Sequence, residues 1–172
     1  MKQIKINLPF DNKILSNLKV NDKILLSGVI YTARDAAHKK MFDAKKAPIN
    51  LKGQVIYYTG PTPTPPKKIV GSCGPTTSSR MDEFVDFMVN EIKISAMIGK
   101  GKRSRKVIDV CKKNKVLYLI APGGCGALIA DCIRKFELVA YPELLAEAIY
   151  KMEVFEMPLV VGIDVLGNYI YE

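Results

Sequence analysis

Residues 107–126, VIDVCKKNKVLYLIAPGGCG, contain the pattern that decides the fold. Residues 107–113 are predicted to form a helix, and residues 116–120 are a continuous apolar run of the kind that builds a strand buried on both faces. A glycine-rich turn at residues 122–126 then leads into a second predicted helix at residues 127–134. A buried strand between two helices predicts an α/β fold.

On both sides of residues 107–126, the sequence predicts further strands and helices. Hydrophobic patterns and turn signals predict strands at residues 3–8, 15–20, 24–31, 54–58, 68–72, 159–164 and 169–171. Further helices are predicted at residues 33–41, 81–92 and 142–152. The strand-rich first third suggests that part of the sheet curls toward a barrel.

The length and composition fit one compact domain that covers residues 1–172. A chain of 172 residues that is 48% apolar and 25% charged is long enough to bury a full core. The proline-rich segment at residues 60–66, GPTPTPP, is predicted to be an ordered or semi-rigid loop of this domain and not a linker, because proline cannot donate a backbone hydrogen bond and strand-like sequence follows at once.

The charge and hydropathy of the chain limit the cellular location and the kinds of binding partner that we expect for it. No apolar stretch has the length of a signal peptide or a membrane helix, so we expect a cytoplasmic protein. The net charge of +9 and the basic run at residues 99–106, GKGKRSRK, raise the possibility of nucleic-acid binding. The other lysine pairs are scattered without interleaved aromatic residues. A solvated surface, a field that attracts anions or a basic face for an acidic partner subunit explains the charge more simply.

The four cysteines favour neither a disulfide framework nor a closed metal site. They are irregularly spaced and form no C-x-x-C pair, at Cys73, Cys111, Cys125 and Cys132. We expect mostly free thiols. Cys125 stands out because it lies between glycines, although packing explains it better than reactivity.

The first candidate site is the run GSCGPTTSSR at residues 71–80. It is predicted to join a strand to a helix N-terminus, with Ser79 and Asp82 as a capping box. Hydroxyls and backbone N–H groups would then converge where the helix dipole favours an anion. Thr76 and Arg80 would lie beside that anion, a carboxylate or a phosphate. Plain capping with a surface arginine remains an equally open interpretation.

Two further cations and one histidine are candidates. Lys100 stands between Gly99 and Gly101, where the backbone can approach a ligand closely, although the spacing is not that of a P-loop. Arg34 begins the helix at residues 33–41, and a surface salt bridge with Asp35 or another acid is its alternative role. His38, the only histidine, has no evident acid partner and is predicted to be orientational or structural. These cations and a hydroxyl suit a small dianion, so something else must supply an electrophile.

Taken in order, five motifs resemble the beta region of class I iron-sulfur fumarate hydratases and the related tartrate dehydratases, over nearly the whole chain. The motifs are YTARDAAH at residues 31–38, YTGP at 58–61, GPTTSSRMD at 74–82, MIGKG at 97–101 and APGGCG at 121–126. The resemblance implies a swivelling β/β/α domain, that is, an α/β fold with a partly barrel-like sheet and flanking helices.

The resemblance also implies a function. This chain would be the beta subunit of a hydro-lyase of the tricarboxylic acid cycle that hydrates fumarate reversibly to (S)-malate, with L-tartrate dehydration as the close alternative. A 4Fe-4S cluster, ligated by an alpha subunit and not by this chain, would bind the substrate as a Lewis acid. The assembly would be a heterotetramer of two alpha and two beta chains, and this chain alone would be inactive. A basic RNA- or anion-binding module is a more remote alternative.

The same resemblance implies residue roles. Thr76 corresponds to the proposed base that removes a proton from C3 of malate. Arg34, Arg80 and Lys100 correspond to the cations that hold the substrate carboxylates. Because threonine is a weak base at its ordinary pKa, nearby cations would have to stabilise its alkoxide.

Overall fold

Short helices and strands alternate along the computed structural model, which describes residues 3–172. The strands are β1 (Ile4–Asn7), β2 (Lys23–Thr32), β3 (Val55–Tyr57), β4 (Ala96–Gly99), β5 (Leu117–Ile120), β6 (Ile133–Ala140) and β7 (Ile149–Ile163). The α-helices are α1 (Asn12–Asn17), α2 (Asp35–Ala44), α3 (Asp82–Asn90), α4 (Arg105–Asn114) and α5 (Gly126–Ala130). Two 3₁₀ helices are η1 (Ser78–Met81) and η2 (Pro142–Glu147).

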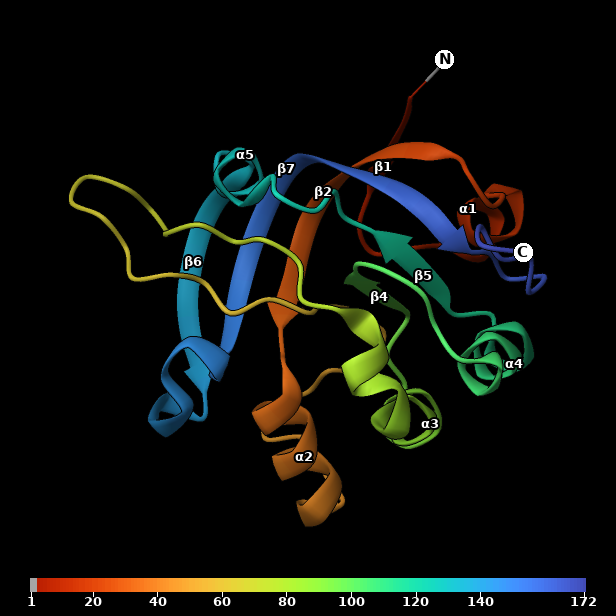
Figure 1. The fold of residues 1–172 in the computed structure, drawn as a ribbon, viewed down its shortest axis with the longest axis horizontal. Coiled ribbons are helices and arrows are strands. Elements are labelled where there is room, and N and C mark those ends of the chain that lie inside the picture. The colour runs from red at the N-terminus through yellow and green to blue at the C-terminus, as the bar shows by residue number, and fades with distance from the viewer. Residues whose placement is uncertain (1–2) are drawn as a thin grey trace.

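Five strands close into a barrel. β2, β3, β4 and β5 pair in parallel in that order. The long strand β7 runs antiparallel to both β5 and β2 and so joins the two ends of this row. β1 extends the sheet beside β2, and β6 extends it beside β7 (Figure 1). The prediction of an α/β fold with a barrel-like sheet and flanking helices is confirmed.

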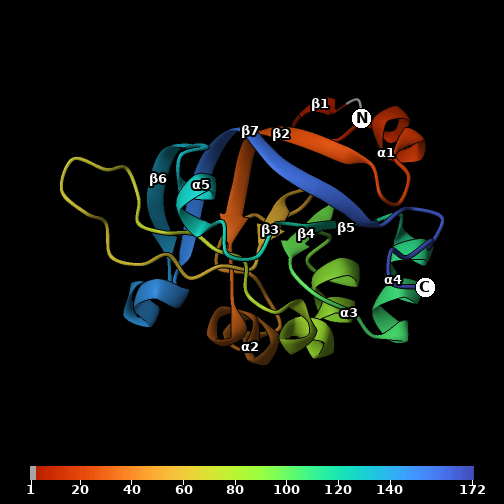
Figure 2. The same ribbon diagram turned by 45° about the horizontal axis from the view of Figure 1, so that its top comes forward.

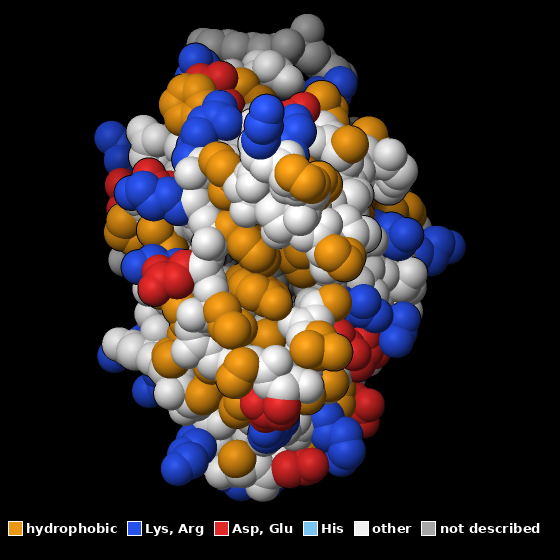
Figure 3. Space-filling model, turned by 90° about the vertical axis from the view of Figure 1, so that its left-hand side faces the viewer, with side chains coloured by type: hydrophobic (Ala, Val, Ile, Leu, Met, Phe, Trp, Pro, Cys, Tyr) orange, Lys and Arg blue, Asp and Glu red, His pale blue; other side chains and the backbone are white. Residues whose placement is uncertain are grey.

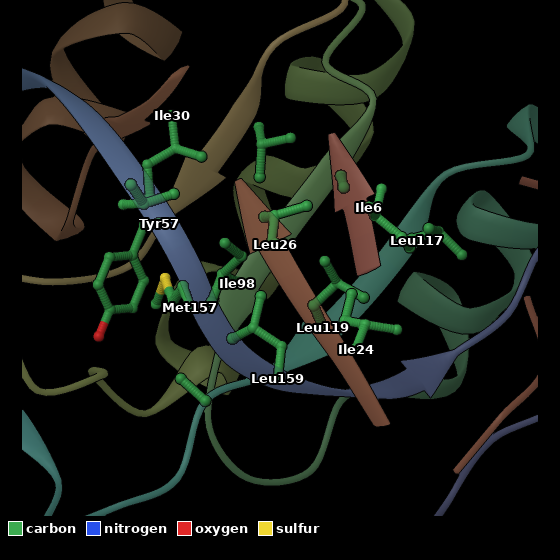
Figure 4. Packing of buried hydrophobic residues seen from close by; sticks show 14 of the residues in the cluster. Ile6, Ile24, Leu26, Ile30, Tyr57, Ile98, Leu117, Leu119, Met157 and Leu159 are labelled. Atoms are coloured by element: carbon green, nitrogen blue, oxygen red, sulfur yellow. The ribbon is translucent and has the colours of Figure 1, made fainter. Parts of the chain in front are cut away.

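The three barrel strands β3, β4 and β5 bury both of their faces, as the apolar run at residues 116–120 predicts for β5. Successive side chains of a strand point to opposite faces. Leu117 and Leu119 of β5 join the inner cluster with residues of the other barrel strands (Figure 4). Tyr118, between them, joins the outer cluster, which packs beneath α2, α3 and α4. These three helices lie together on one side of the barrel (Figure 2).

Two of the predicted strands in the first half of the chain are wrong. Residues 15–20 belong partly to α1, whose N-terminus is capped by the Asp11 carboxylate accepting from the Ile14 backbone N–H at 2.6 Å. Leu18, which follows the helix, is buried in the inner cluster. Residues 68–72 form no strand but the return arm of a loop.

That loop spans residues 60–72 and contains the proline-rich segment. Its two arms are tied by a pair of hydrogen bonds, from the Thr62 N–H to the Ser72 carbonyl at 3.0 Å and from the Ser72 N–H to the Thr62 hydroxyl at 2.8 Å. Together with α5 and β6 it borders a groove of about 430 Å³ lined in part by Ile69 and Arg134. Hydrophobic side chains gather on the face of the molecule shown in Figure 3.

The C-terminal third also differs from the prediction. The helix predicted at residues 142–152 is only the 3₁₀ helix η2, and the chain then enters β7. β7 pairs with β2 on one side and β6 on the other, and this long-range ladder overrides the local helical spacing. The helix at 127–134 is shortened to α5 because Ile133 begins β6. Residues 169–171 contribute one bridge, from Tyr169 to Ile163. Within residues 3–172, no helix is both long and apolar enough to cross a bilayer.

Candidate active site

The carboxyl ends of the four parallel strands form one edge of the barrel. The strand register sets a row of paired residues across that edge: Thr32, Tyr57, Ile98 and Leu119. Two positions further along the chain, the residues leaving the strands are Arg34, Thr59, Lys100 and Ala121. In α/β folds, closed barrels as well as open sheets, ligands bind outside the carboxyl ends of the parallel strands. Arg34 and Lys100, distant in sequence, therefore leave the sheet at the same edge.

The loop at residues 71–80 lies across the same edge and brings Thr76 beside Lys100. The Thr76 N–H donates to the Tyr58 carbonyl at 2.6 Å, and the Lys100 N–H approaches the Thr76 carbonyl at 3.4 Å. The Ser78 N–H donates to the Lys100 carbonyl at 2.9 Å. Two of the predicted site residues are thus neighbours through backbone contacts. The amides of Thr76 and Ser78, by the same contacts, already have partners within the protein.

A buried pair of hydroxyls supports the Lys100 turn. The Tyr118 hydroxyl lies 2.9 Å from both the Gly101 carbonyl and the Ser78 hydroxyl. Since a carbonyl can only accept, Tyr118 donates to Gly101 and accepts from Ser78. Burial raises the pKa of Tyr118, so the phenol stays protonated. A Cβ on Gly99 would overlap the Ser78 hydroxyl, and this close approach explains the glycine before Lys100.

Arg34 and Arg80, the other two predicted cations, both lie beside the Asp35 carboxylate. The Arg80 Nε donates to Asp35 Oδ1 at 2.9 Å. The Arg34 Nε lies 3.7 Å from Asp35 Oδ2 and 3.8 Å from Glu147 Oε1. The Arg80 side chain is 53% exposed and that of Arg34 is 25% exposed. Arg34 therefore does have the acidic partners that its alternative role requires, while Arg80 still faces solvent.

The segment that follows β3 lies between the two pairs of site residues. Tyr58 accepts the Thr76 N–H, as described above, and the Thr59 hydroxyl donates to the Gly74 carbonyl at 2.8 Å. A Cβ on Gly60 would come within 2.8 Å of the Arg34 Nη1. Lys100 and the turn at residues 122–126 are also close, since a Cβ on Gly123 would lie 3.9 Å from the Lys100 Cδ.

The capping box predicted for Ser79 and Asp82 does not form. α3 has no side-chain cap. The Asp82 carboxylate instead accepts from the Arg103 Nε at 2.7 Å and from the Ser104 N–H at 2.8 Å. A long-range ion pair outweighs a local cap here because the Arg103 side chain is fully buried and needs a counter-charge. The Asp82 carboxylate is thus engaged with Arg103 and Ser104 and not with the start of its own helix.

Arg103 is the functional neighbour that sequence reasoning missed. Its guanidinium lies 4.8 Å from the centre of the Tyr118 ring and 5.4 Å from that of Tyr58, both of which support the site. It falls within the basic run at residues 99–106, and nothing in the sequence separates it from its surface neighbours. The run is therefore no continuous basic surface, since one of its charges is internal.

His38 is buried directly beneath the site. Its Nδ1 lies 2.8 Å from the Arg34 carbonyl, which can only accept, so Nδ1 carries the proton. The ring packs against Tyr58 and Phe84, with centroids 5.4 and 5.9 Å away. Burial lowers its pKa to about 4, so the ring is neutral at physiological pH. These contacts agree with the predicted structural role.

We expect His38 to make stability depend on pH. The unfolded histidine titrates near 6.5 and the folded one near 4, so the unfolded state binds more protons between these values and stability is lost as pH falls through this window. The free energy of unfolding should drop by about 2 kcal/mol between pH 7 and pH 5 from this group alone. Chemical denaturation of the wild type and of His38→Gln at both pH values measures it. An equal drop in the two proteins would contradict the assignment.

The cysteines offer no metal site in the described part of the chain. Burial raises the pKa of Cys73 and of Cys111 to about 12, so both are protonated and inert. Cys125 and Cys132 are partly exposed and free. Across residues 3–172, no three acidic, histidine or cysteine side chains gather closely enough to hold a metal ion.

Comparison with known proteins finds relatives of two kinds. "Fumarate hydratase class I, anaerobic" of Escherichia coli (strain K12) is 39% identical over 99% of this chain and 32% of its own length. "Fumarate hydratase 2" of Leishmania major is 38% identical over 98% and 31%. The "Putative L(+)-tartrate dehydratase subunit beta" of Methanocaldococcus jannaschii is 38% identical over 93% of this chain and 87% of its own length.

The chain thus spans about a third of the length of the fumarate hydratases that it matches, and most of the length of the tartrate dehydratase subunit. A family described as "Fumarase C-terminus" matches the sequence over residues 1–172, and the chain belongs to this family.

Proposed function

We propose that this chain is the beta-type part of a hydro-lyase that hydrates fumarate reversibly to (S)-malate in the cytoplasm. The observation that carries the proposal is the placement of Thr76, Lys100, Arg34 and Arg80 at one edge of the barrel in a chain of this family. Three cations and a hydroxyl at this edge suit a small substrate with two carboxylates.

The partner in this proposal is an alpha-type chain, with two copies of each chain in the assembly. The fumarate hydratases that the chain matches are about three times as long, which supports a missing larger part. The subunit name of the tartrate dehydratase relative supports a separate chain as that part. A 4Fe-4S cluster on the partner would supply Lewis-acid activation of the substrate hydroxyl. Burial and a raised pKa make Cys73 and Cys111 of this chain poor ligands for such a cluster.

The residues of this chain bind and orient the substrate in the proposed reaction. Arg80 presents its outer nitrogens to one carboxylate, because its Nε is occupied by Asp35. Lys100 and Arg34 provide the remaining positive charge. Thr76 acts as an alkoxide that has lost its own proton to solvent and that the ammonium of neighbouring Lys100 and the Arg80 guanidinium stabilise. It takes the proton from C3 of malate and becomes a neutral hydroxyl, while the C3–H electron pair forms the double bond and the C2 hydroxyl leaves.

L-Tartrate is the second candidate substrate. The Methanocaldococcus jannaschii relative is a putative L(+)-tartrate dehydratase subunit beta, and this chain matches 87% of that relative's length. Tartrate also has two carboxylates and a hydroxyl, so the same cations would serve. The basic RNA-binding alternative has less support, since Arg103 is internal.

The test is anaerobic co-expression with the alpha-type partner, followed by assays of fumarate, malate and tartrate. We expect the purified complex to change the ultraviolet absorbance of fumarate, and each chain alone to be inactive. Turnover of tartrate but not of fumarate or malate would select the second candidate. A complex with an intact cluster that converts none of the three would overturn the proposal.

A further inference from the structure

Asp35 lies between the two arginines of the candidate site. It is the first residue of α2, directly after Arg34, and its carboxylate is 32% exposed. α2 is held in place by the buried side chains of Ala37, His38 and Met41. The carboxylate is therefore carried by a fixed element and not by a mobile loop.

One oxygen of this carboxylate sets the direction of Arg80. The Arg80 Nε donates to Asp35 Oδ1 at 2.9 Å, and within the described residues 3–172 no other acidic side chain lies within 4.0 Å of Arg80. With Nε held, the two Nη groups form the free edge of the guanidinium. This edge can donate two parallel hydrogen bonds to a substrate carboxylate.

The other oxygen faces Arg34. Asp35 Oδ2 and the Arg34 Nε are both buried, neither has a hydrogen-bond partner, and they lie 3.7 Å apart. The attraction between these opposite charges offsets part of the free-energy cost of burying two polar groups without hydrogen bonds. Glu147 adds a second carboxylate at 3.8 Å from the same nitrogen. Asp35 thus lies beside both guanidinium groups, and Glu147 shares the charge of Arg34 with it.

We propose that Asp35 is a positioning residue that orients Arg80 and Arg34 toward the carboxylates of the substrate without touching the substrate itself. The inference rests on the proposed function of the site. Asparagine could not replace it. Its amide oxygen could accept from one arginine, but its NH₂ group would face the other as donor against donor.

The experiment uses the complex with the alpha-type partner and the substitution Asp35→Asn. We expect KM for malate and for fumarate to rise by about ten- to a hundredfold, with a smaller change in kcat. Calorimetric binding of succinate, a dicarboxylate that cannot be hydrated, should weaken by a similar factor. Asp43→Asn is the matched control, because Asp43 lies on the same helix and makes only an exposed pair with Lys39.

A double-mutant cycle separates orientation from a merely structural role. In the Arg80→Lys complex, which lacks Nε and the planar fork, Asp35→Asn should weaken succinate binding by clearly less than in the wild-type complex. An equal factor in both backgrounds, or unchanged KM and succinate binding in Asp35→Asn, would overturn the proposal. A wild-type complex that converts no substrate would instead overturn the proposed function.

Discussion

Replacing Thr76 with alanine is expected to lower kcat of the assembled complex by about 10²- to 10⁴-fold, the usual contribution of a positioned general base. The Thr76 backbone is held by Tyr58 and Lys100, so the loop should keep its shape without the hydroxyl. Assembly with the partner and the absorbance of the cluster should therefore be unchanged. Anaerobic initial rates with malate measure the effect.

Thr77→Ala is the matched control for this prediction. Thr77 is the next residue, is exposed, and forms a backbone bridge with Lys100 that alanine can also form. We expect rates close to those of the wild type. If Thr77→Ala lost turnover while Thr76→Ala kept it, the hydroxyl in the site would be that of Thr77 and the assignment of the base would be wrong.

The second large effect is expected on stability. Asp82→Ala should lower the free energy of unfolding by about 3–5 kcal/mol, because it leaves the Arg103 guanidinium buried without a counter-charge. The substitution also removes the acceptor of the Ser104 N–H. Denaturant unfolding of the isolated chain, followed by circular dichroism, measures the loss.

Asp86→Ala controls for the loss of a carboxylate from α3. Asp86 is exposed and accepts only from the Asn90 side chain on the same helix, so the change should stay within about 0.5 kcal/mol. Arg103→Met should cost less than Asp82→Ala, since it removes the buried charge itself. Equal stability of Asp82→Ala and Asp86→Ala would mean that the Arg103 charge is compensated in another way.

Local pattern identified several strands correctly. The runs at residues 54–58 and 116–120 became β3 and β5, which are buried on both faces, and residues 3–8 and 24–31 became β1 and β2, which are buried mainly on one face. The predicted helices that fail are those whose residues are needed by a long-range partner. Residues 149–152 continue the helical spacing of the residues before them, yet they form the start of β7, where they pair with the neighbouring strands β2 and β6.

For the candidate site, too, the sequence predicted the local features but not the long-range contacts. The residue types were available from the sequence, since a glycine-flanked lysine and a Thr–Arg run before a helix are local features. Asp35 appeared there only as a possible salt-bridge partner of Arg34. Its contact with Arg80, 45 positions away, depends on where α2 and η1 come to rest on the barrel.

By itself the sequence determined an α/β fold and the family that its motifs resemble, and it predicted Thr76, Arg34, Arg80 and Lys100 as the candidate site residues. Only the tertiary structure decided how they meet. The parallel register brings Arg34 and Lys100 to one edge, and closure of the barrel by β7 fixes the order of the strands. Because Arg103 is buried, Asp82 forms an ion pair with it and does not take part in the predicted capping box. The physical reason is that pairing and desolvation act between residues far apart in the chain, whereas sequence patterns report mainly on neighbours.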